Sequence, residues 1–421
     1  MGLRFQLTTY SPVSAGGIRA GAAAARAAAA DDPRAELRDA LRAAYAADDA
    51  VLCGSGTQAL QLAIATAVAD GGAGVPRLVA LPAFCCYDVA AAAVGARVGV
   101  LLYDVDPATL APDLDSLRRT LAQGARAVVA CPLYGVPLDW DAVEGVAAEF
   151  GAVVVEDAAQ GHGGSLRGRP LGALGRVSVL SFGRGKGWSG ARGGAVLVRR
   201  GMAAPAAAEL AAAGGERGVV AAALAQWTLG RPNVYRLPRS LPFLGLGETR
   251  YHAPVPPAAM TRAAAAMVLH SRAEAQREGE ARRAHARFYL ERLRPGGGTQ
   301  AVRAPSGGEP GYLRLPVRLA HGMSAFARPP LALGVGTTYP TTLETLPQLR
   351  PALRGAPARY PGAEELVRTL VTLPTHSRLS RRERERVIAA VHRAVTPAAV
   401  VPHVVVRGVT VESAIATQQH D

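Results

Sequence analysis

The chain has 421 residues, a formal net charge of +14 at pH 7 and 49% hydrophobic residues. This length exceeds what one small core supports, so two domains are expected. No apolar stretch reaches the roughly 20 residues that span a bilayer, and Arg26 interrupts the Ala-rich run at residues 21–30, so we expect a cytoplasmic protein without a membrane partner.

We expect no nucleic-acid partner in spite of the positive charge. Basic residues are scattered, and aromatic residues make up only 5% of the chain; charge of this kind gives only non-specific affinity. The four cysteines lack the spacing of a metal site, so we expect reduced, mostly buried thiols and no metal. They are Cys53, Cys85, Cys86 and Cys131.

Apolar runs alternate with helical patterns through the first part of the chain. The predicted buried strands span residues 50–53, 78–81, 98–103, 127–131 and 152–156. The predicted helices span residues 34–47, 57–69, 87–94, 113–122 and 139–150. This rhythm is typical of a parallel or mostly parallel sheet covered on both faces.

The pattern changes further along the chain. Residues 177–182 and 194–199 predict two strands joined by a Gly-rich loop without a helix. An Ala-rich helical stretch and a Pro-rich connector follow within residues 200–257, and an amphipathic helix over about 257–293 is expected to start the second domain. Later segments predict strands near 313–319, helices near 363–370 and 381–394, and a β-like run at 404–411. The expected units are a large domain at 1–250, a small one at 251–395 and a tail at 396–421.

Lysine usage is the sharpest compositional signal. Lys186 is the only lysine among the 47 Lys and Arg residues. Arginine replaces lysine as a surface charge, but its delocalised, permanently protonated guanidinium forms no stable imine. A single retained lysine therefore indicates a need for an amine, although chance survival of one surface lysine is the alternative.

Three short motifs follow predicted strands. The turn Gly54-Ser55-Gly56-Thr57 opens a predicted helix, where free N–H groups and hydroxyls suit a phosphate. The alternative is that Ser or Thr here is only an ordinary helix cap. The segment 156–160 (EDAAQ) places carboxylates where ligands gather in open α/β sheets; a helix cap or a structural ion pair is the alternative. The segment 181–186 (SFGRGK) places Ser181 five residues before Lys186.

Together with their order, these motifs make the sequence resemble the DegT–StrS type nucleotide-sugar aminotransferases, a family of fold-type I pyridoxal-phosphate enzymes. The resemblance covers about residues 34–395. Its matching stretches are GSGTQAL (54–60), GARVGVLLYDVDPATL (95–110), PLYGVPLDWDAV (132–143), VVEDAAQGHGG (154–164), SFGRGKGWSGARGGA (181–195) and LPTHSRLS (373–380).

The resemblance implies an α/β fold of type I, with a mostly parallel mixed sheet flanked by helices in a large domain and a smaller α+β C-terminal domain. It also implies pyridoxal 5'-phosphate as cofactor, and Lys186 as the catalytic residue that holds it as a Schiff base. Asp157, the second catalytic residue, would pair with the pyridine nitrogen. The other cofactor-binding residues would be Gly56, Thr57 and Ser181 at the phosphate, Gln160 near the ring's 3-oxygen and Phe84 stacked on the ring.

The implied reaction moves an amino group from an amino acid, expected to be glutamate, to a nucleotide-linked keto sugar, in a homodimer. Three positions depart from the family pattern. Glu248 stands where an Asn reaches the partner's phosphate, and Trp188 and Arg192 follow the lysine where polar and acidic residues are usual. These departures keep open a non-sugar carbonyl acceptor. A non-catalytic regulatory or binding protein is a separate alternative, against which Lys186, Asp157 and Ser181 argue together. Lys186 argues against the related dehydratases, which have histidine there.

Overall fold

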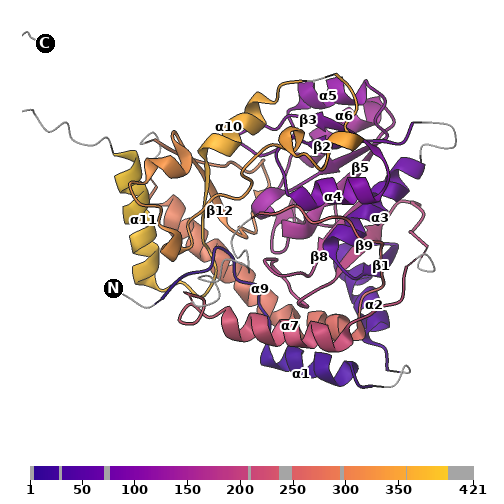
Figure 1. Cartoon of the computed structure of the whole chain (residues 1–421), viewed down its shortest axis with the longest axis horizontal. Helices are drawn as coiled ribbons and strands as arrows, with labels where there is room; N and C mark the ends of the chain where they lie inside the picture. The colour runs from indigo at the N-terminus through magenta and orange to yellow at the C-terminus, as the bar shows by residue number, and fades with distance from the viewer. Residues whose placement is uncertain are drawn as a thin grey trace, which may run out of the picture.

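The computed structural model describes residues 4–27, 31–70, 76–206, 210–236, 249–293, 298–356 and 358–396. A seven-stranded sheet forms its centre, with the strand order β1-β9-β8-β5-β4-β2-β3 (Figure 1). These strands are β1 (Asp49–Cys53), β2 (Leu78–Pro82), β3 (Gly99–Tyr103), β4 (Ala127–Ala130), β5 (Val153–Asp157), β8 (Val177–Ser181) and β9 (Gly194–Val198).

The sheet is mixed but mostly parallel, as the sequence predicts. The four pairings among β2, β3, β4, β5 and β8 are parallel, whereas β9 pairs antiparallel with both β8 and β1. Consecutive residues of β4 and β9 are buried, so both faces of the sheet are covered.

Helices cover the sheet. They are α2 (Pro33–Tyr45), α3 (Gly56–Ala69), α4 (Tyr87–Gly95), α5 (Leu114–Leu121) and α6 (Trp140–Glu149). All of them except α4 begin at a side-chain cap. Asp32, Ser55, Asp113 and Asp139 each accept a hydrogen bond from an N–H in the first turn of the helix that follows. Helix α3 packs on β8 and β9, and α6 on β5, which fixes where α3 begins relative to the sheet.

A second, antiparallel sheet belongs to the C-terminal part. It contains β10 (Thr299–Ala301), β12 (Leu315–Leu319) and β13 (Leu370–Leu373), and α10 (Pro361–Thr369) and α11 (Arg381–Val395) pack nearby. A capping box formed by Ser380 and Glu383 starts α11. The 29-residue helix α9 (Arg262–Leu290) links the two parts. Its first half packs with Phe182 and Leu197, and its last turns pack with residues of α11.

The remaining elements are short or peripheral. They are α1 (Ala15–Ala24), α7 (Glu216–Leu229), β6 (Ser165–Leu166), β7 (Arg169–Pro170), β11 (Gly308–Glu309), and the 3-10 turns η1 (Leu133–Gly135), η2 (Ala158–Gln160), η5 (Gly322–Ala325), η6 (Leu331–Leu333), η7 (Leu343–Thr345) and η8 (Arg350–Ala352). Helix α1 lies along α9 and α7 (Figure 1).

The predicted strands and helices are present with shifts of a few residues at their ends. Helix α1 has no counterpart in the sequence prediction, and residue 370, the last residue of a predicted helix, begins strand β13 instead. The β-like run at 404–411 lies outside the described residues, and the domain boundary at 250/251 stays a prediction. Within the described ranges, no helix is both long and apolar enough to cross a membrane.

Candidate active site

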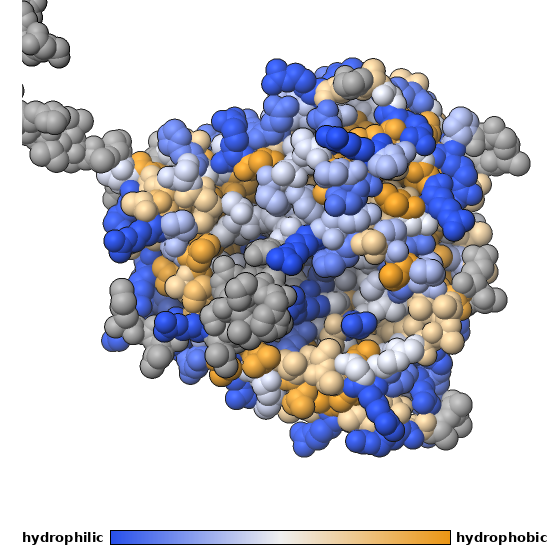
Figure 2. Space-filling view, viewed as in Figure 1, coloured by the Kyte–Doolittle hydropathy of each residue, from blue (hydrophilic) through white to orange (hydrophobic). Residues whose placement is uncertain are grey.

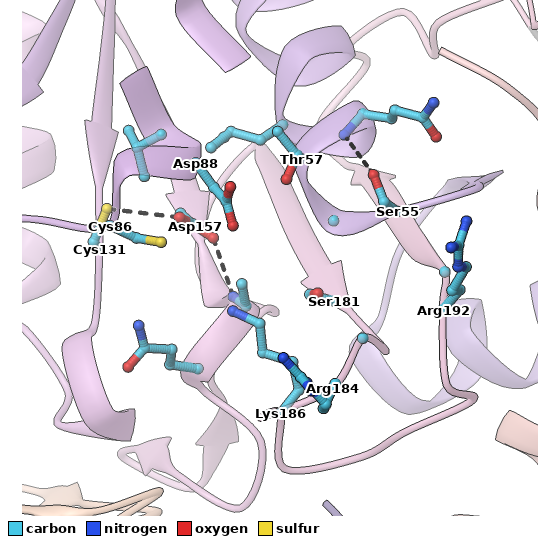
Figure 3. A pocket seen from close by; sticks show the side chains of 18 of the residues that line it. Ser55, Thr57, Cys86, Asp88, Cys131, Asp157, Ser181, Arg184, Lys186 and Arg192 are labelled. Atoms are coloured by element: carbon cyan, nitrogen blue, oxygen red, sulfur yellow. Dashed lines mark hydrogen bonds between the residues drawn. The ribbon is translucent and has the colours of Figure 1, made fainter. Parts of the chain in front are cut away.

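The carboxyl ends of the central strands surround one pocket. Strands β1, β4, β5 and β8 end at its edge, and β9 begins there because it runs in the opposite direction. The pocket has a volume of about 330 Å³, and ligands of open α/β sheets bind at this edge. Six of the seven predicted site residues line it, namely Gly56, Thr57, Asp157, Gln160, Ser181 and Lys186. Figure 3 shows Thr57, Asp157, Ser181 and Lys186 around the pocket.

One side of the pocket is a cradle of open hydrogen-bond donors. Ser55 caps α3 by accepting the N–H of Gln58 at 3.2 Å, so the next two residues, Gly56 and Thr57, present the first N–H groups of the helix, which have no partner within it. The hydroxyls of Thr57 and Ser181 form no hydrogen bond with described residues. A Cβ on Gly56 would lie 2.5 Å from the Cβ and Oγ of Ser181. The close approach of helix and strand therefore requires glycine at position 56.

Asp157 is the last residue of β5 and forms the opposite side of the pocket. Its Oδ1 accepts the N–H of Ala159 at 3.1 Å, and its Oδ2 accepts the Sγ–H of Cys131 at 3.8 Å. Burial raises the pKa of the Asp157 carboxyl, and the ammonium of Lys186 is the largest influence that lowers it. Burial and the charge of Lys186 therefore act on the pKa of Asp157 in opposite directions.

The neighbouring carboxylate, Glu156, points away from the pocket. It is 0% exposed, and it accepts hydrogen bonds from Gly172 N, Leu174 N, Gly175 N and Ser178 Oγ at 2.6–3.1 Å. Side chains alternate between the faces of a strand, so Glu156 holds the 172–178 segment while Asp157 faces the pocket. Glu156 therefore has a structural role through neutral donors, and the helix cap expected as an alternative for this motif is made by Asp157, which caps η2.

Lys186 lies in the loop between β8 and β9 and is partly buried. Gly185 has a φ of +81°, which favours glycine, and its N–H donates to Ser11 Oγ at 2.6 Å. A Cβ on Gly187 would lie 3.0 Å from Nη1 of the buried Arg282. The loop is thus held on both sides of the lysine, whose amine extends toward Asp157 (Figure 3).

Gln160 lines the pocket with its amide fixed at both ends. Its Oε1 accepts the N–H of Tyr134 at 2.9 Å, and its Nε2 donates to the hydroxyl of Tyr339 at 2.9 Å. Tyr339 is buried, and burial is the main cause that raises its pKa. This network sets the orientation of the Gln160 side chain beside Asp157.

The stacking role predicted for Phe84 does not agree with its position. Phe84 is 1% exposed, does not line the pocket, and packs edge-on against Tyr339 with ring centroids 5.2 Å apart. Its apolar ring is buried in the core beneath the turn, and Cys86, two residues later at the start of α4, lines the pocket instead. Residue spacing in this irregular turn gave no signal for which side chain would face the ligand.

The pocket lining also contains residues outside the predicted site, among them Cys86, Asp88 and Cys131. Burial raises the pKa of Cys86. A hydrogen bond with Cys85 is the first cause that raises the pKa of Cys131, followed by burial. These thiols are therefore neutral at physiological pH and contribute small, weakly polar walls.

The unusual residues after Lys186 separate into two kinds. Trp188 is buried, donates its Nε1–H to Val268 O at 2.9 Å and packs edge-on against Phe182, so its role is structural. Arg192 is exposed and lines the pocket. Glu248 lies outside the described residues.

Comparison with known proteins identifies the relatives of this chain. The L-glutamine:2-deoxy-scyllo-inosose aminotransferase of Streptoalloteichus tenebrarius is 34% identical over 144 residues, 34% of this chain and 33% of that protein. The UDP-2-acetamido-2-deoxy-3-oxo-D-glucuronate aminotransferase of Pseudomonas aeruginosa is 33% identical over 150 residues, 35% of this chain and 40% of that protein. The matched segments thus span about a third of the length of these curated relatives.

The likeness in fold extends much further. The sugar aminotransferase CalS13 from Micromonospora echinospora superposes with a TM-score of 0.69 at 22% identity, covering 91% of this chain and 98% of that one. The model of the DegT/DnrJ/EryC1/StrS aminotransferase family matches residues 31–392. Because this match takes in most of the chain and the whole pocket, the chain belongs to the DegT/DnrJ/EryC1/StrS aminotransferase family.

Proposed function

We propose that the protein is a pyridoxal-phosphate-dependent aminotransferase that moves an amino group from an amino acid to the carbonyl carbon of a keto acceptor. One observation carries this proposal. The only lysine of the chain lines the same pocket as Asp157 and the open donors of Gly56, Thr57 and Ser181.

The pocket residues fit the proposed cofactor. The donors of Thr57 and Ser181, with the first N–H groups of α3, suit a phosphate, and they have no other partner in the described part of the chain. Asp157 lies across the pocket, where its carboxylate would keep a pyridine nitrogen protonated. When bound, pyridoxal phosphate supplies the electron sink that makes the donor's α-proton removable.

The chain's own residues would then divide the work. Nζ of Lys186 would hold the cofactor and, when free, would carry the proton to and from the donor's α-carbon. A placed base of this kind contributes about 10²–10⁴-fold. The carboxylate of Asp157 would hold the proton on the ring nitrogen, and Gln160, fixed by Tyr134 and Tyr339, would orient the ring through its polar substituent.

Borohydride reduction tests this assignment directly. Reduction of the protein incubated with pyridoxal phosphate is expected to leave a phosphopyridoxyl group on the peptide that contains Lys186. Because the chain has no other lysine, a Lys186 peptide without the phosphopyridoxyl group after reduction would refute the proposal. Lys186→Arg is the matched control, since arginine keeps the charge and forms no stable imine.

A second assay identifies the acceptor. We propose a nucleotide-linked keto sugar as acceptor and glutamate as donor; the Pseudomonas relative is named for a UDP-linked 3-oxo sugar acid and the Streptoalloteichus relative for glutamine and an inosose. Protein charged with pyridoxamine phosphate, then mixed with single keto sugars, inososes or non-sugar ketones, should regain the pyridoxal form only with its true acceptor. A response to non-sugar ketones alone would favour the alternative acceptor class.

We also propose a homodimer. Val255 lines the pocket and is 60% exposed, and hydrophobic residues gather over α7 (Figure 2), where Leu224 and Leu229 are 49% and 40% exposed. A second subunit covering these side chains would remove apolar area from water. Light scattering that gives only the monomer mass would contradict the dimer. The cytoplasmic location stays a prediction.

A further inference from the structure

The cradle that would receive the phosphate offers donors but no cation of its own. Its groups are hydroxyls and backbone N–H groups of Gly56, Thr57 and Ser181. A phosphate monoester carries about −1.5 to −2 charges at pH 7, so a cation at this side of the pocket would strengthen its binding. The cationic residues of the lining are Arg184, Lys186 and Arg192.

Lys186 belongs to the other side of the pocket. Its ammonium is the main charge that lowers the pKa of Asp157, and the proposed function uses its amine for the bond to the cofactor. Arg184 precedes it by two residues, on the part of the loop that Ser11 holds through Gly185. Neither position lies against the turn that begins α3.

Arg192 does lie against that turn. The next residue, Gly193, forms a parallel bridge with Ser55 and donates its N–H to Gly54 O at 3.1 Å. A Cβ on Gly194 would lie 2.5 Å from Ser55 O and 2.7 Å from Gly56 N. The backbone at residues 193–194 is therefore packed on the cradle, and Arg192 lies beside Ser55 at the pocket mouth (Figure 3).

The guanidinium of Arg192 is available for a ligand. The side chain is exposed, and it forms no hydrogen bond or ion pair with the residues that the structure describes. By contrast, other exposed arginines form ion pairs, such as Arg118 with Glu149 and Arg167 with Asp141. Arg192 is thus an unpaired cation that lines the same pocket as the open donors of Thr57 and Ser181.

We propose that Arg192 binds the phosphate group of the cofactor, supplying the cation that the cradle lacks. The inference rests on the proposed function, because it takes pyridoxal phosphate as the ligand. A guanidinium presents two parallel N–H groups that match two phosphate oxygens, and such charged pairs are stronger than neutral ones. Arg192 would then decide how tightly the cofactor is retained while Lys186 is free.

The test compares two ligands that differ only in the phosphate. Apo-protein is titrated with pyridoxal phosphate and with pyridoxal, following protein fluorescence, for the wild type, Arg192→Gln and Arg184→Gln. Arg192→Gln is expected to weaken pyridoxal phosphate binding about 10- to 100-fold, the range of a lost hydrogen bond to a charged group, and to leave pyridoxal binding within about twofold. Arg184→Gln, a second unpaired arginine of the same loop, should leave the ratio of the two affinities unchanged.

The outcomes separate this inference from the proposed function. Equal affinities of wild type and Arg192→Gln for pyridoxal phosphate, or equal losses for both ligands, would overturn the role of Arg192. A phosphate-selective loss in Arg184→Gln alone would overturn it as well. A wild type that binds neither ligand and forms no adduct at Lys186 would instead refute the proposed function. Arg192→Lys, which restores the charge, should recover part of the lost affinity, and circular dichroism confirms that each variant is folded.

Discussion

Replacing Gly56 by alanine probes the contact on which the cradle is built. The new Cβ would lie 2.5 Å from both the Cβ and the Oγ of Ser181 and 3.3 Å from its Cα, whereas carbon atoms in contact prefer about 3.5–4.0 Å. Rotating the hydroxyl would relieve only one of these overlaps. Ser181 ends a central strand of the sheet, so the start of α3 must shift instead.

The cost follows from two opposing effects. Overpacking of a dense region lowers the free energy of unfolding by about 1–3 kcal/mol, whereas replacing a helical glycine by alanine raises it by about 0.5–1 kcal/mol. Gly145→Ala isolates the second effect, because Gly145 lies within α6 and a Cβ there meets nothing within 4 Å. We therefore expect Gly145→Ala to stabilise the protein by about 0.5–1 kcal/mol and Gly56→Ala to destabilise it by up to about 2 kcal/mol.

Urea unfolding of the apo-protein measures the two free energies, and titration with pyridoxal phosphate measures the effect on the site. Gly56→Ala is expected to lose about tenfold or more in affinity, because a shifted helix start misplaces the N–H donors, whereas Gly145→Ala should bind normally. Adding Ser181→Gly removes both clashing atoms, so the double variant should regain stability but not affinity. If Gly56→Ala matched Gly145→Ala in both stability and affinity, the cradle geometry would be wrong.

Further predictions concern Asp157, Glu156 and His376. Asp157→Asn should slow transamination by about 10²–10³-fold, as loss of an electrostatic partner does, with little change in the unfolding free energy. Glu156→Gln should cost at least about 2 kcal/mol of stability, because four buried donors lose their carboxylate. A kinetic effect in Glu156→Gln and a stability effect in Asp157→Asn would refute this division of roles. His376 is 1% exposed, and burial lowers its pKa to about 4, below the value of about 6.5 in the unfolded chain. Between these values the unfolded state binds a proton that the folded state does not, so His376 should reduce stability by about 1.4 kcal/mol for each pH unit below 6.5, down to about pH 4. The stability difference between the wild type and His376→Gln should therefore shift by that slope between pH 6.5 and pH 5, and a difference that is constant with pH would contradict this.

Local patterns in the sequence were sufficient for much of this fold. Strand and helix signals depend on neighbouring residues, so the positions of β1, β2, β4, β5 and β8 were predicted almost to the residue, and the parallel arrangement placed their ends at one edge. Lys186 stood out by composition alone, without any knowledge of the fold. The family resemblance then gave Asp157, Gln160 and Ser181 their expected roles, and all three line the pocket.

Only the tertiary structure decided which side chains of the irregular segments reach the pocket. After β2 the chain leaves the regular alternation of a strand, so spacing could not show that Phe84 enters the core and Cys86 faces the pocket. The nearness of Arg192 to the Gly54–Thr57 turn depends on the pairing of β9 with β1, in which Cys53 faces Gly194 across about 140 residues of chain. Such register is set by the packing of the whole sheet, because a strand's own residues carry its period of alternation but not the identity of its partner.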